Sequence, residues 1–382
     1  MPNVAPSYDL PSTYHLPDLL AELPWPRLLS EHYEEVRVES DAWIESFNPF
    51  NEKGQEAFRA CDFSRLSALT YSPREKAIIR LGADLMDLFF TFDEYTDIQD
   101  HAGALAYRDI VDDAFRNPDK PRPEGEACLG AIAKDFWNRA RAIVLPNAPC
   151  LGHFLKDWEG FSSNVVQEAE DRMNQRSRGF YDYLKIRRHT SGSYPTLALC
   201  EFGLDLPEEV YQHPLFVVLR DQAADLIALI NDVYSLAMER SRGLNWHNSV
   251  MLVMREQNVG LPEAMDWILD YGQRVVKSFN ANVDALPSWG PEVDERVKVY
   301  VQGIAQNIRG VDDWTFESHR YFGPKGMEIK RTRMMSPFPP GHGFVRMGEG
   351  ADEEDKEGAI KNDAVTPSLV SQVYPVDYVV AA

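Results

Sequence analysis

Three oxygen-bearing side chains recur at a fixed spacing in the second half of the chain. Asn231, Ser235 and Glu239 stand at i, i+4 and i+8, which on an α-helix places an amide, a hydroxyl and a carboxylate in one row. Oxygen ligands suit a hard cation such as Mg²⁺, which usually completes its shell with water and phosphate. The row therefore predicts a metal site for a phosphorylated or diphosphorylated substrate. The alternative interpretation is an incidental polar stripe on a helix.

A second acidic group lies earlier in the chain, where Asp93 and Asp97 are spaced i, i+4. Such a pair is usually a solvated helix face. Here it directly follows the strongly aromatic stretch 88–92, Leu-Phe-Phe-Thr-Phe, and carboxylates that follow a buried apolar stripe favour the lining of a pocket. We therefore expect Asp93 and Asp97 to face the first row across the metal site.

Two basic motifs could neutralise a phosphate. Arg187 and Arg188 precede Gly192, which is typical of a helix that ends or breaks beside an anion. A helix C-terminus with basic residues and a glycine cap would give the same pattern. Near the end of the helical part, Arg320 could bind phosphate while the hydroxyl of Tyr321 bridges to a carboxylate.

Helices must position these groups. Ser72-Pro73-Arg74-Glu75 predicts a helix start, with Ser72 as the N-cap and Pro73 at the first helical position. Apolar residues at helical spacing then lead into Asp93, and similar patterns predict helices over 215–240, 261–285 and 292–321. Because there is no βαβ alternation, glycine-rich phosphate loop or internal repeat, the Rossmann and P-loop classes are excluded. The predicted fold class is all-α.

The two ends differ from this helical part. Residues 1–26 contain six prolines, which predicts an extended arm on the surface of the domain. Residues 27–335 are predicted to form one domain. Residues 336–382 combine the acidic run 352–355 with prolines and show no helical period, which predicts a disordered acidic tail.

Composition limits the possible partners and compartments. The net charge of −21 argues against nucleic acid and anionic membrane surfaces. No apolar run approaches about 18 residues, so no integral membrane segment is expected, and the N-terminus lacks the pattern of a signal peptide. Four scattered cysteines without a CxxC pair indicate free thiols, which favours a cytoplasmic protein.

Taken in order, these motifs resemble those of class I terpene synthases of the fungal sesquiterpene type, over roughly residues 25–325. Asp93-Glu94-x-x-Asp97 is similar to the family's aspartate-rich motif, and Asn231-Asp232-x-x-Ser235-x-x-x-Glu239 is similar to its metal-binding triad. The resemblance implies that Arg188 is the pyrophosphate-sensing arginine, with Ser191 and Gly192 as its linker and effector. It also implies a late arginine–tyrosine pair at Arg320-Tyr321 and aromatic pocket walls at Phe89 and Trp314, although a tryptophan is more often a core residue.

The resemblance further implies a single α-helical bundle around a central apolar cavity, with three Mg²⁺ ions at its mouth, in a monomer or homodimer. The substrate would be farnesyl diphosphate, bound through the metals, Arg188, Arg320 and Tyr321. One position departs from the family, which often has a basic residue where this chain has Met238. Lys185 or Arg187 could replace it, whereas Arg240 lies about 200° around the helix from Met238.

Which carbon atoms of the substrate join in the first ring closure is a question beyond the enzyme class. The segments 92–97 and 241–248 look most like those of basidiomycete enzymes, which favours closure of C1 onto C11 through a humulyl cation and a protoilludene-type product. Closure of C1 onto C10, giving germacrene- or cadinene-type skeletons, is the alternative.

A prenyltransferase would need a second aspartate-rich motif at 231–235. A helical binding protein with a decayed site is a further alternative, and it would be indifferent to EDTA.

Overall fold

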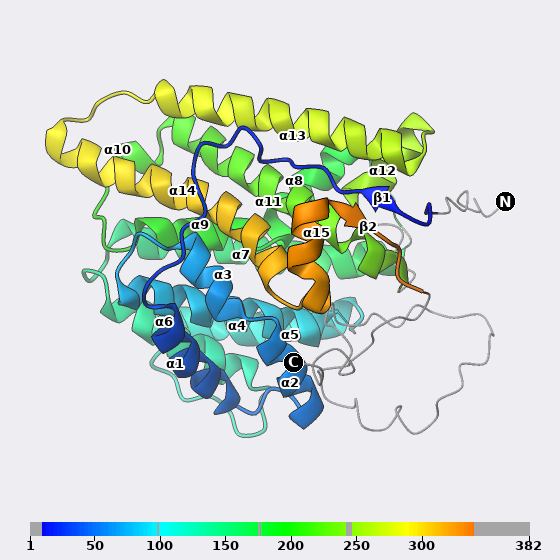
Figure 1. Ribbon diagram of the computed structural model, residues 1–382. Coiled ribbons are helices and arrows are strands. Elements are labelled where there is room, and N and C mark those ends of the chain that lie inside the picture. Colours follow the sequence, from blue (N-terminus) through cyan, green and yellow to red (C-terminus); the bar gives the residue numbers. More distant parts are fainter. Residues whose placement is uncertain (1–9, 98, 175, 177, 242–246, 340–382) are drawn as a thin grey trace.

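The computed structural model describes residues 10–97, 99–174, 176, 178–241 and 247–339. These residues fold almost entirely into helices (Figure 1). The only sheet among them is a short clasp, in which β1 (Tyr14–His15) pairs antiparallel with β2 (Met334–Met335). The predicted all-α class is therefore confirmed.

The helices of the first half, in chain order, are α1 (Tyr33–Glu45), α2 (Glu52–Ala60), α3 (Phe63–Thr70), α4 (Lys76–Thr96), α5 (His101–Arg116), α6 (Leu129–Ala142), α7 (Pro149–Met173), α8 (Phe180–Thr190) and α9 (Ser193–Ala198). A 3-10 turn, η1 (Leu199–Glu201), follows. The second half contributes α10 (Glu208–Tyr211), α11 (Pro214–Ser241), α12 (Ser249–Gln257), α13 (Leu261–Asp284), α14 (Pro291–Glu317), η2 (Gly323–Lys325) and α15 (Gly326–Thr332). No described helix combines the length and the apolar character needed to cross a bilayer.

Helix α11 occupies the centre of the bundle. It packs against α8, α9, α12, α13 and α14, and Figure 1 shows α13 along one edge of the molecule with α1 and α2 at the opposite edge. The successive residues Leu226, Ile227, Ala228 and Leu229 point to different sides of α11 and are all buried, as expected for a helix enclosed by neighbours. Helix α4 packs on α1, α3, α5 and α6, and α3 in turn packs on α14.

The N-terminal arm differs from its prediction. Its described part, residues 10–26, is extended (Figure 1), but it does not simply lie on the surface, because Leu16 and Leu19 are fully buried. The side chain of Arg309 on α14 donates hydrogen bonds to the carbonyls of Trp25, Leu20 and Leu23 at 3.0–3.2 Å. These bonds satisfy backbone acceptors that have no helical partner, so a proline-rich segment can contribute leucines to the core.

Two predicted helix boundaries also shift. Helix α4 begins at Lys76 with Glu75 as its N-cap, so the predicted cap at Ser72 is wrong. Arg74 is buried and donates to the carbonyl oxygen of Cys200 at 2.8 Å, which holds residues 72–75 in a turn against η1. Helix α14 ends at Glu317, because Ser318 has extended backbone.

The predicted C-terminal tail lies mostly outside the described residues. Of its described part, 336–339, Phe338 packs against the hydrophobic core, so the folded part extends slightly beyond residue 335. Gly243, which stands just past the helix predicted over 215–240 and is a candidate for its C-terminal cap, also lies outside the described residues.

Candidate active site

The predicted row of oxygen donors is present on α11. Ser235 and Glu239 are buried, and the Ser235 hydroxyl donates to Glu239 Oε1 at 2.6 Å. Asn231 lies one turn earlier on the same face. Asn248 was not among the predicted site residues, yet its amide donates to Glu239 Oε2 at 3.0 Å and to the carbonyl of Asp232 at 2.6 Å. Asn248 is the N-cap of α12, and an asparagine before a helix is a signal that local sequence can show. Its contact with Glu239 on α11 joins two helices, and local sequence cannot show such a contact.

The pKa of the Glu239 carboxyl group is raised in the folded protein. Burial raises the pKa of Glu239 to about 7, and the charge of Asp232 acts in the same direction. Hydrogen bonds from Ser235 and Asn248 and the charge of Arg187 lower that pKa, without cancelling the effect of burial. A cation beside Glu239 would favour the charged carboxylate, so the residue is suited to bind one.

Arg187 on α8 reaches this row. Its Nη2 donates to Asn231 Oδ1 at 2.5 Å, and its Nε donates to Asp232 Oδ1 at 3.3 Å. Burial lowers the pKa of Arg187, but the charges of Tyr183 and Asp232 outweigh this and raise it overall, so the guanidinium stays charged. Lys185, the other residue considered as a replacement for the basic group missing at Met238, is exposed and pairs with Asp182 at 3.0 Å.

Arg188, the neighbouring residue, points to a different part of α11. Its Nε and Nη2 donate to the two carboxylate oxygens of Asp225 at 2.6 and 2.9 Å, and its Nη1 donates to Asp221 at 3.1 Å. The hydroxyl of Tyr194 on α9 also donates to Asp221, at 2.7 Å. Arg188 therefore links the end of α8, next to α9, to the part of α11 that precedes Asn231.

Gly192 forms that junction and touches the aromatic wall. It has φ of +70°, a left-handed conformation that favours glycine, and a Cβ at this position would lie 3.4 Å from Cζ of Phe89. The Phe89 ring stacks on Trp158 with centroids 5.4 Å apart and meets Phe161 edge-on at 4.8 Å. The structure thus brings Gly192 and Phe89 together, and it adds two aromatic residues of α7 that sequence analysis missed.

The aspartate pair lies at the C-terminal end of α4. Asp93 and Asp97 are half-buried, whereas Glu94 between them is buried. Asp97 is the C-cap, and its N–H donates to the carbonyl of Asp93 at 2.8 Å. The charge of Asp93 acts on the guanidinium of Arg320, which places the end of α4 near the C-terminal basic motif.

Arg320 and Tyr321 connect the two acidic regions. The guanidinium carbon of Arg320 lies 4.3 Å from the ring centroid of Phe90 on α4, and its Nε donates to the Tyr321 hydroxyl at 3.3 Å. That hydroxyl also accepts a hydrogen bond of 2.7 Å from the amide of Asn231. Trp314 is buried beneath this turn: its indole N–H donates to the carbonyl of Cys61 at 2.8 Å, and its ring meets Tyr321 edge-on.

The described residues do not gather three or more His, Cys, Asp or Glu side chains into a preformed metal cluster. The available donors on α11 are instead an amide, a hydroxyl and one carboxylate in a row, with the hydroxyl and carboxylate oxygens 2.6 Å apart. This donor set fits a hard cation that takes its remaining ligands from water and phosphate. Asp93 lies on another helix, α4, and its charge acts on the guanidinium of Arg320.

Comparison with known proteins agrees with this fold and site. The family model described as terpene synthase family 2, C-terminal metal binding, matches residues 84–278. A sesquiterpene synthase of Cyclocybe aegerita is 56% identical over 86% of this chain and 88% of its own length. A delta(6)-protoilludene synthase of Stereum hirsutum is 43% identical over 85% of this chain and 88% of its own length. The chain therefore belongs to the terpene synthase family and is an enzyme, a carbon–oxygen lyase acting on phosphates.

Solved structures show the same fold at much lower identity. A linalool/nerolidol synthase from Streptomyces clavuligerus superposes with a TM-score of 0.68 at 19% identity, covering 77% of this chain and 98% of that protein. A cucumene synthase variant gives a TM-score of 0.68 at 20% identity, covering 78% and 100%. The architecture is thus that of class I terpene synthases.

Proposed function

We propose that the protein is a Mg²⁺-dependent sesquiterpene cyclase that ionises farnesyl diphosphate, releases diphosphate and closes the resulting carbocation to a C15 hydrocarbon. The relatives named as sesquiterpene synthases, at 56% and 44% identity, support the substrate class. The observation that carries the proposal is the position of Asn231. Its amide contacts Arg187 on one side and Tyr321, next to Arg320, on the other.

The diphosphate needs local positive charge in a protein of net charge −21. Arg187 and Arg320 supply it from two sides of Asn231, and arginine can grip phosphate with two parallel hydrogen bonds. We assign the direct diphosphate contacts to these two residues, together with the hydroxyl of Tyr321. Arg188, which the family resemblance names as the sensing arginine, is bound by Asp225 and in this proposal positions Gly192 against Phe89.

Asn231, Ser235 and Glu239 would hold Mg²⁺ on α11, and Asp93 with Asp97 would hold it on α4, with three ions expected from the family. When bound, the ions neutralise the charge that develops on the departing diphosphate. Arg187 and Arg320 contribute to the same neutralisation, because fixed cations in a water-poor site favour separation of the charged leaving group. Tyr321 keeps the turn of Arg320 next to the triad while this occurs.

The carbocation that remains must be kept from water until it is closed. Phe89, Trp158 and Phe161 form an aromatic cluster behind Gly192, and an aromatic face can stabilise a desolvated cation by about 2 kcal/mol. We propose 1,11-closure to a protoilludene-type product, supported by delta(6)-protoilludene synthases at 43% and 40% identity. The 1,10-closing route is the alternative outcome of the product analysis.

The test is gas chromatography–mass spectrometry of products from purified protein and farnesyl diphosphate, with Mg²⁺ or with EDTA. A C15 hydrocarbon formed only with Mg²⁺ is expected, and its skeleton distinguishes 1,11- from 1,10-closure. The Asp93→Asn variant should lose this turnover. No product from folded protein would favour a longer prenyl diphosphate as the substrate, and near-normal turnover in Asp93→Asn would contradict the metal assignment.

A further inference from the structure

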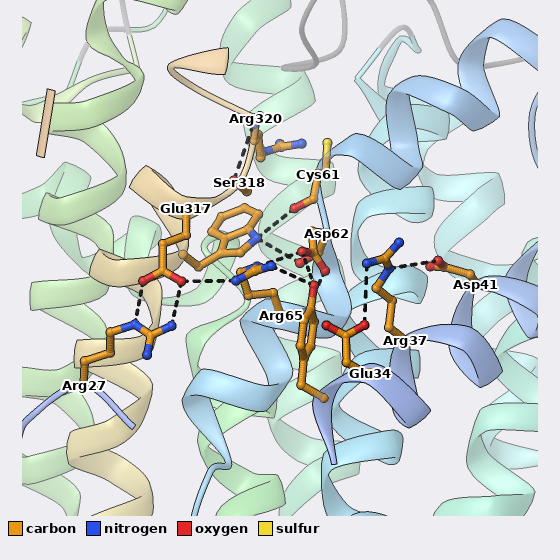
Figure 2. Close-up of polar contacts among 12 residues, drawn as sticks. Arg27, Glu34, Arg37, Asp41, Cys61, Asp62, Arg65, Glu317, Ser318 and Arg320 are labelled. Carbon is orange, nitrogen blue, oxygen red and sulfur yellow. Dashed lines mark hydrogen bonds and ion pairs between the residues drawn. The ribbon is translucent and has the colours of Figure 1, made fainter. Parts of the chain in front are cut away.

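A connected set of charged side chains lies close to the segment that carries Arg320 and belongs to no motif described above (Figure 2). Arg27, directly after the N-terminal arm, donates to both oxygens of Glu317, at 2.6 and 2.8 Å. Arg65 on α3 donates through Nη1 to Glu317 at 3.3 Å and through Nε to Asp62 at 2.8 Å. Arg65 thereby joins the end of α14 to the turn between α2 and α3.

Asp62 is held in a strained conformation at that turn. Its φ of 49° and ψ of 58° are left-handed, a conformation that residues other than glycine adopt less readily. Three donors hold its carboxylate: the N–H and Nε of Arg65, at 3.1 and 2.8 Å, and the hydroxyl of Tyr33, at 2.6 Å. The side chains of Arg65, Asp62 and Glu317 are 25%, 16% and 10% exposed, so water competes only weakly for these bonds.

The turn at residues 60–62 also holds the segment that carries Arg320. The carbonyl of Ala60 accepts the N–H of His319 at 3.2 Å, and the carbonyls of Cys61 and Asp62 both accept the indole N–H of Trp314, at 2.8 and 3.1 Å. The backbone immediately before Arg320 is therefore fixed by residues 60–62.

The same turn also fixes the surface beneath the Arg320 guanidinium. Phe63 directly follows Asp62, and its ring stacks on Phe90 with centroids 3.9 Å apart and planes 13° apart. Arg320 lies over both rings, 4.3 Å from the centroid of Phe90 and 5.8 Å from that of Phe63. A change in the Asp62 backbone would displace Phe63 and the His319 contact together.

We propose that Arg65 is a positioning residue for diphosphate binding: by holding Asp62 and Glu317 together it sets the place of the Arg320–Tyr321 turn. The inference rests on the proposed function, in which Arg320 contacts the diphosphate. The influence of Arg65 passes through its bond to Asp62, in the turn at residues 60–62, and through its bond to Glu317, at the end of α14.

The test is calorimetric titration of the full-length protein with inorganic pyrophosphate in the presence of Mg²⁺. Arg65→Met should weaken pyrophosphate binding about tenfold. Arg65→Lys should give an intermediate value, because an ammonium on a flexible stem replaces only part of the two-sided guanidinium contact. The matched control is Arg274→Met, which removes a surface arginine that pairs with Asp270 at 2.9 Å on α13 and should bind pyrophosphate as the wild type does.

A merely structural role for Arg65 predicts a different pattern. Arg65→Met would then melt at a lower temperature but would bind pyrophosphate with unchanged affinity once folded, and that result would overturn the inference. If Arg65→Met does not fold, Glu317→Gln serves as the second variant, since it keeps the side-chain size and removes the charge that Arg65 and Arg27 share; unchanged affinity there is equally contrary.

Arg320→Met separates this inference from the proposed function. If Arg320→Met loses pyrophosphate binding while Arg65→Met keeps it, Arg65 does not position the turn and only the further inference fails. If Arg320→Met itself binds normally, the assignment of the diphosphate site fails, and the inference fails with it.

Discussion

The amide of Asn231 donates a hydrogen bond of 2.7 Å to the hydroxyl of Tyr321, ninety positions later in the chain. This contact joins the oxygen row of α11 to the turn that carries Arg320. The opposite side of the same amide, Oδ1, accepts a hydrogen bond from Arg187. Oδ1 is the atom that would serve as a metal ligand in the proposed site, so Arg187 would lie beside the bound cation, within reach of a phosphate oxygen that the cation holds.

The two adjacent arginines of α8 should therefore behave differently. Arg187→Met should weaken inhibition by inorganic pyrophosphate and lower kcat/KM by about 100-fold, because a charge aimed at the leaving group is lost. Arg188→Met should mainly lower the melting temperature, since it leaves the buried Asp225 carboxylate without its bidentate partner. Inhibition constants and melting curves of both variants provide the measurement. The opposite pattern would assign the sensing role to Arg188.

Glu239→Gln separates the charge of this proposed metal ligand from its packing. Glutamine has nearly the same size and can keep hydrogen bonds to Ser235 and Asn248, so the metal-free protein should melt at or above the wild-type temperature. Turnover at a fixed Mg²⁺ concentration should fall by about 100-fold or more. Circular dichroism melting is the control for folding, and turnover as a function of Mg²⁺ concentration is the test; a wild-type curve would remove Glu239 from the metal site.

The α11 row was predictable because its spacing is a local property of one helix. The directions of Arg187 and Arg188 were not, since neighbouring residues point about 100° apart on a helix and only packing decides which one meets Asn231. The cap predicted at Ser72 failed for a similar reason. The donors of Arg74 find carbonyl groups at Cys200 and Phe202, more than 120 positions away, and local sequence cannot show such partners.

Truncation should locate the end of the stable domain. A chain ending at residue 339 should melt like the full-length protein, because it keeps β2 and the core contact of Phe338. A chain ending at residue 332 should melt at a lower temperature. It loses the bond from Arg333 to the Tyr234 hydroxyl, at 3.0 Å, and the ion pair with Asp18, at 3.4 Å.

Melting curves of the two truncated proteins and the full-length chain make this comparison. If the protein ending at residue 339 melts at a clearly lower temperature, residues 340–382 contribute to stability, contrary to the expectation of an independent tail. Equal melting of all three proteins would show that the β1–β2 clasp is not needed for stability.

A partly buried carboxylate on α7 predicts how stability depends on pH. Burial raises the pKa of Asp157 on α7 to about 6, although the charges of Arg220, Lys156 and His153 act to lower it. In the unfolded chain an aspartate titrates near 3.9. As the pH falls through 6 the folded protein therefore binds a proton that the unfolded chain does not, and this group makes the protein more stable.

Asp157→Asn should remove that dependence. Near pH 8 the variant should resist urea better than the wild type, by about 1–2 kcal/mol of unfolding free energy. The difference should shrink towards zero near pH 4, where the folded wild type already carries a neutral carboxyl group. Comparing the two proteins at each pH cancels other titrating groups, such as His153 with its partner Glu201. If the variant is less stable than the wild type near pH 8, the charged Asp157 carboxylate stabilises the protein through a cation. Arg220 is the candidate, because its charge lowers the pKa of Asp157 more than any other charge does.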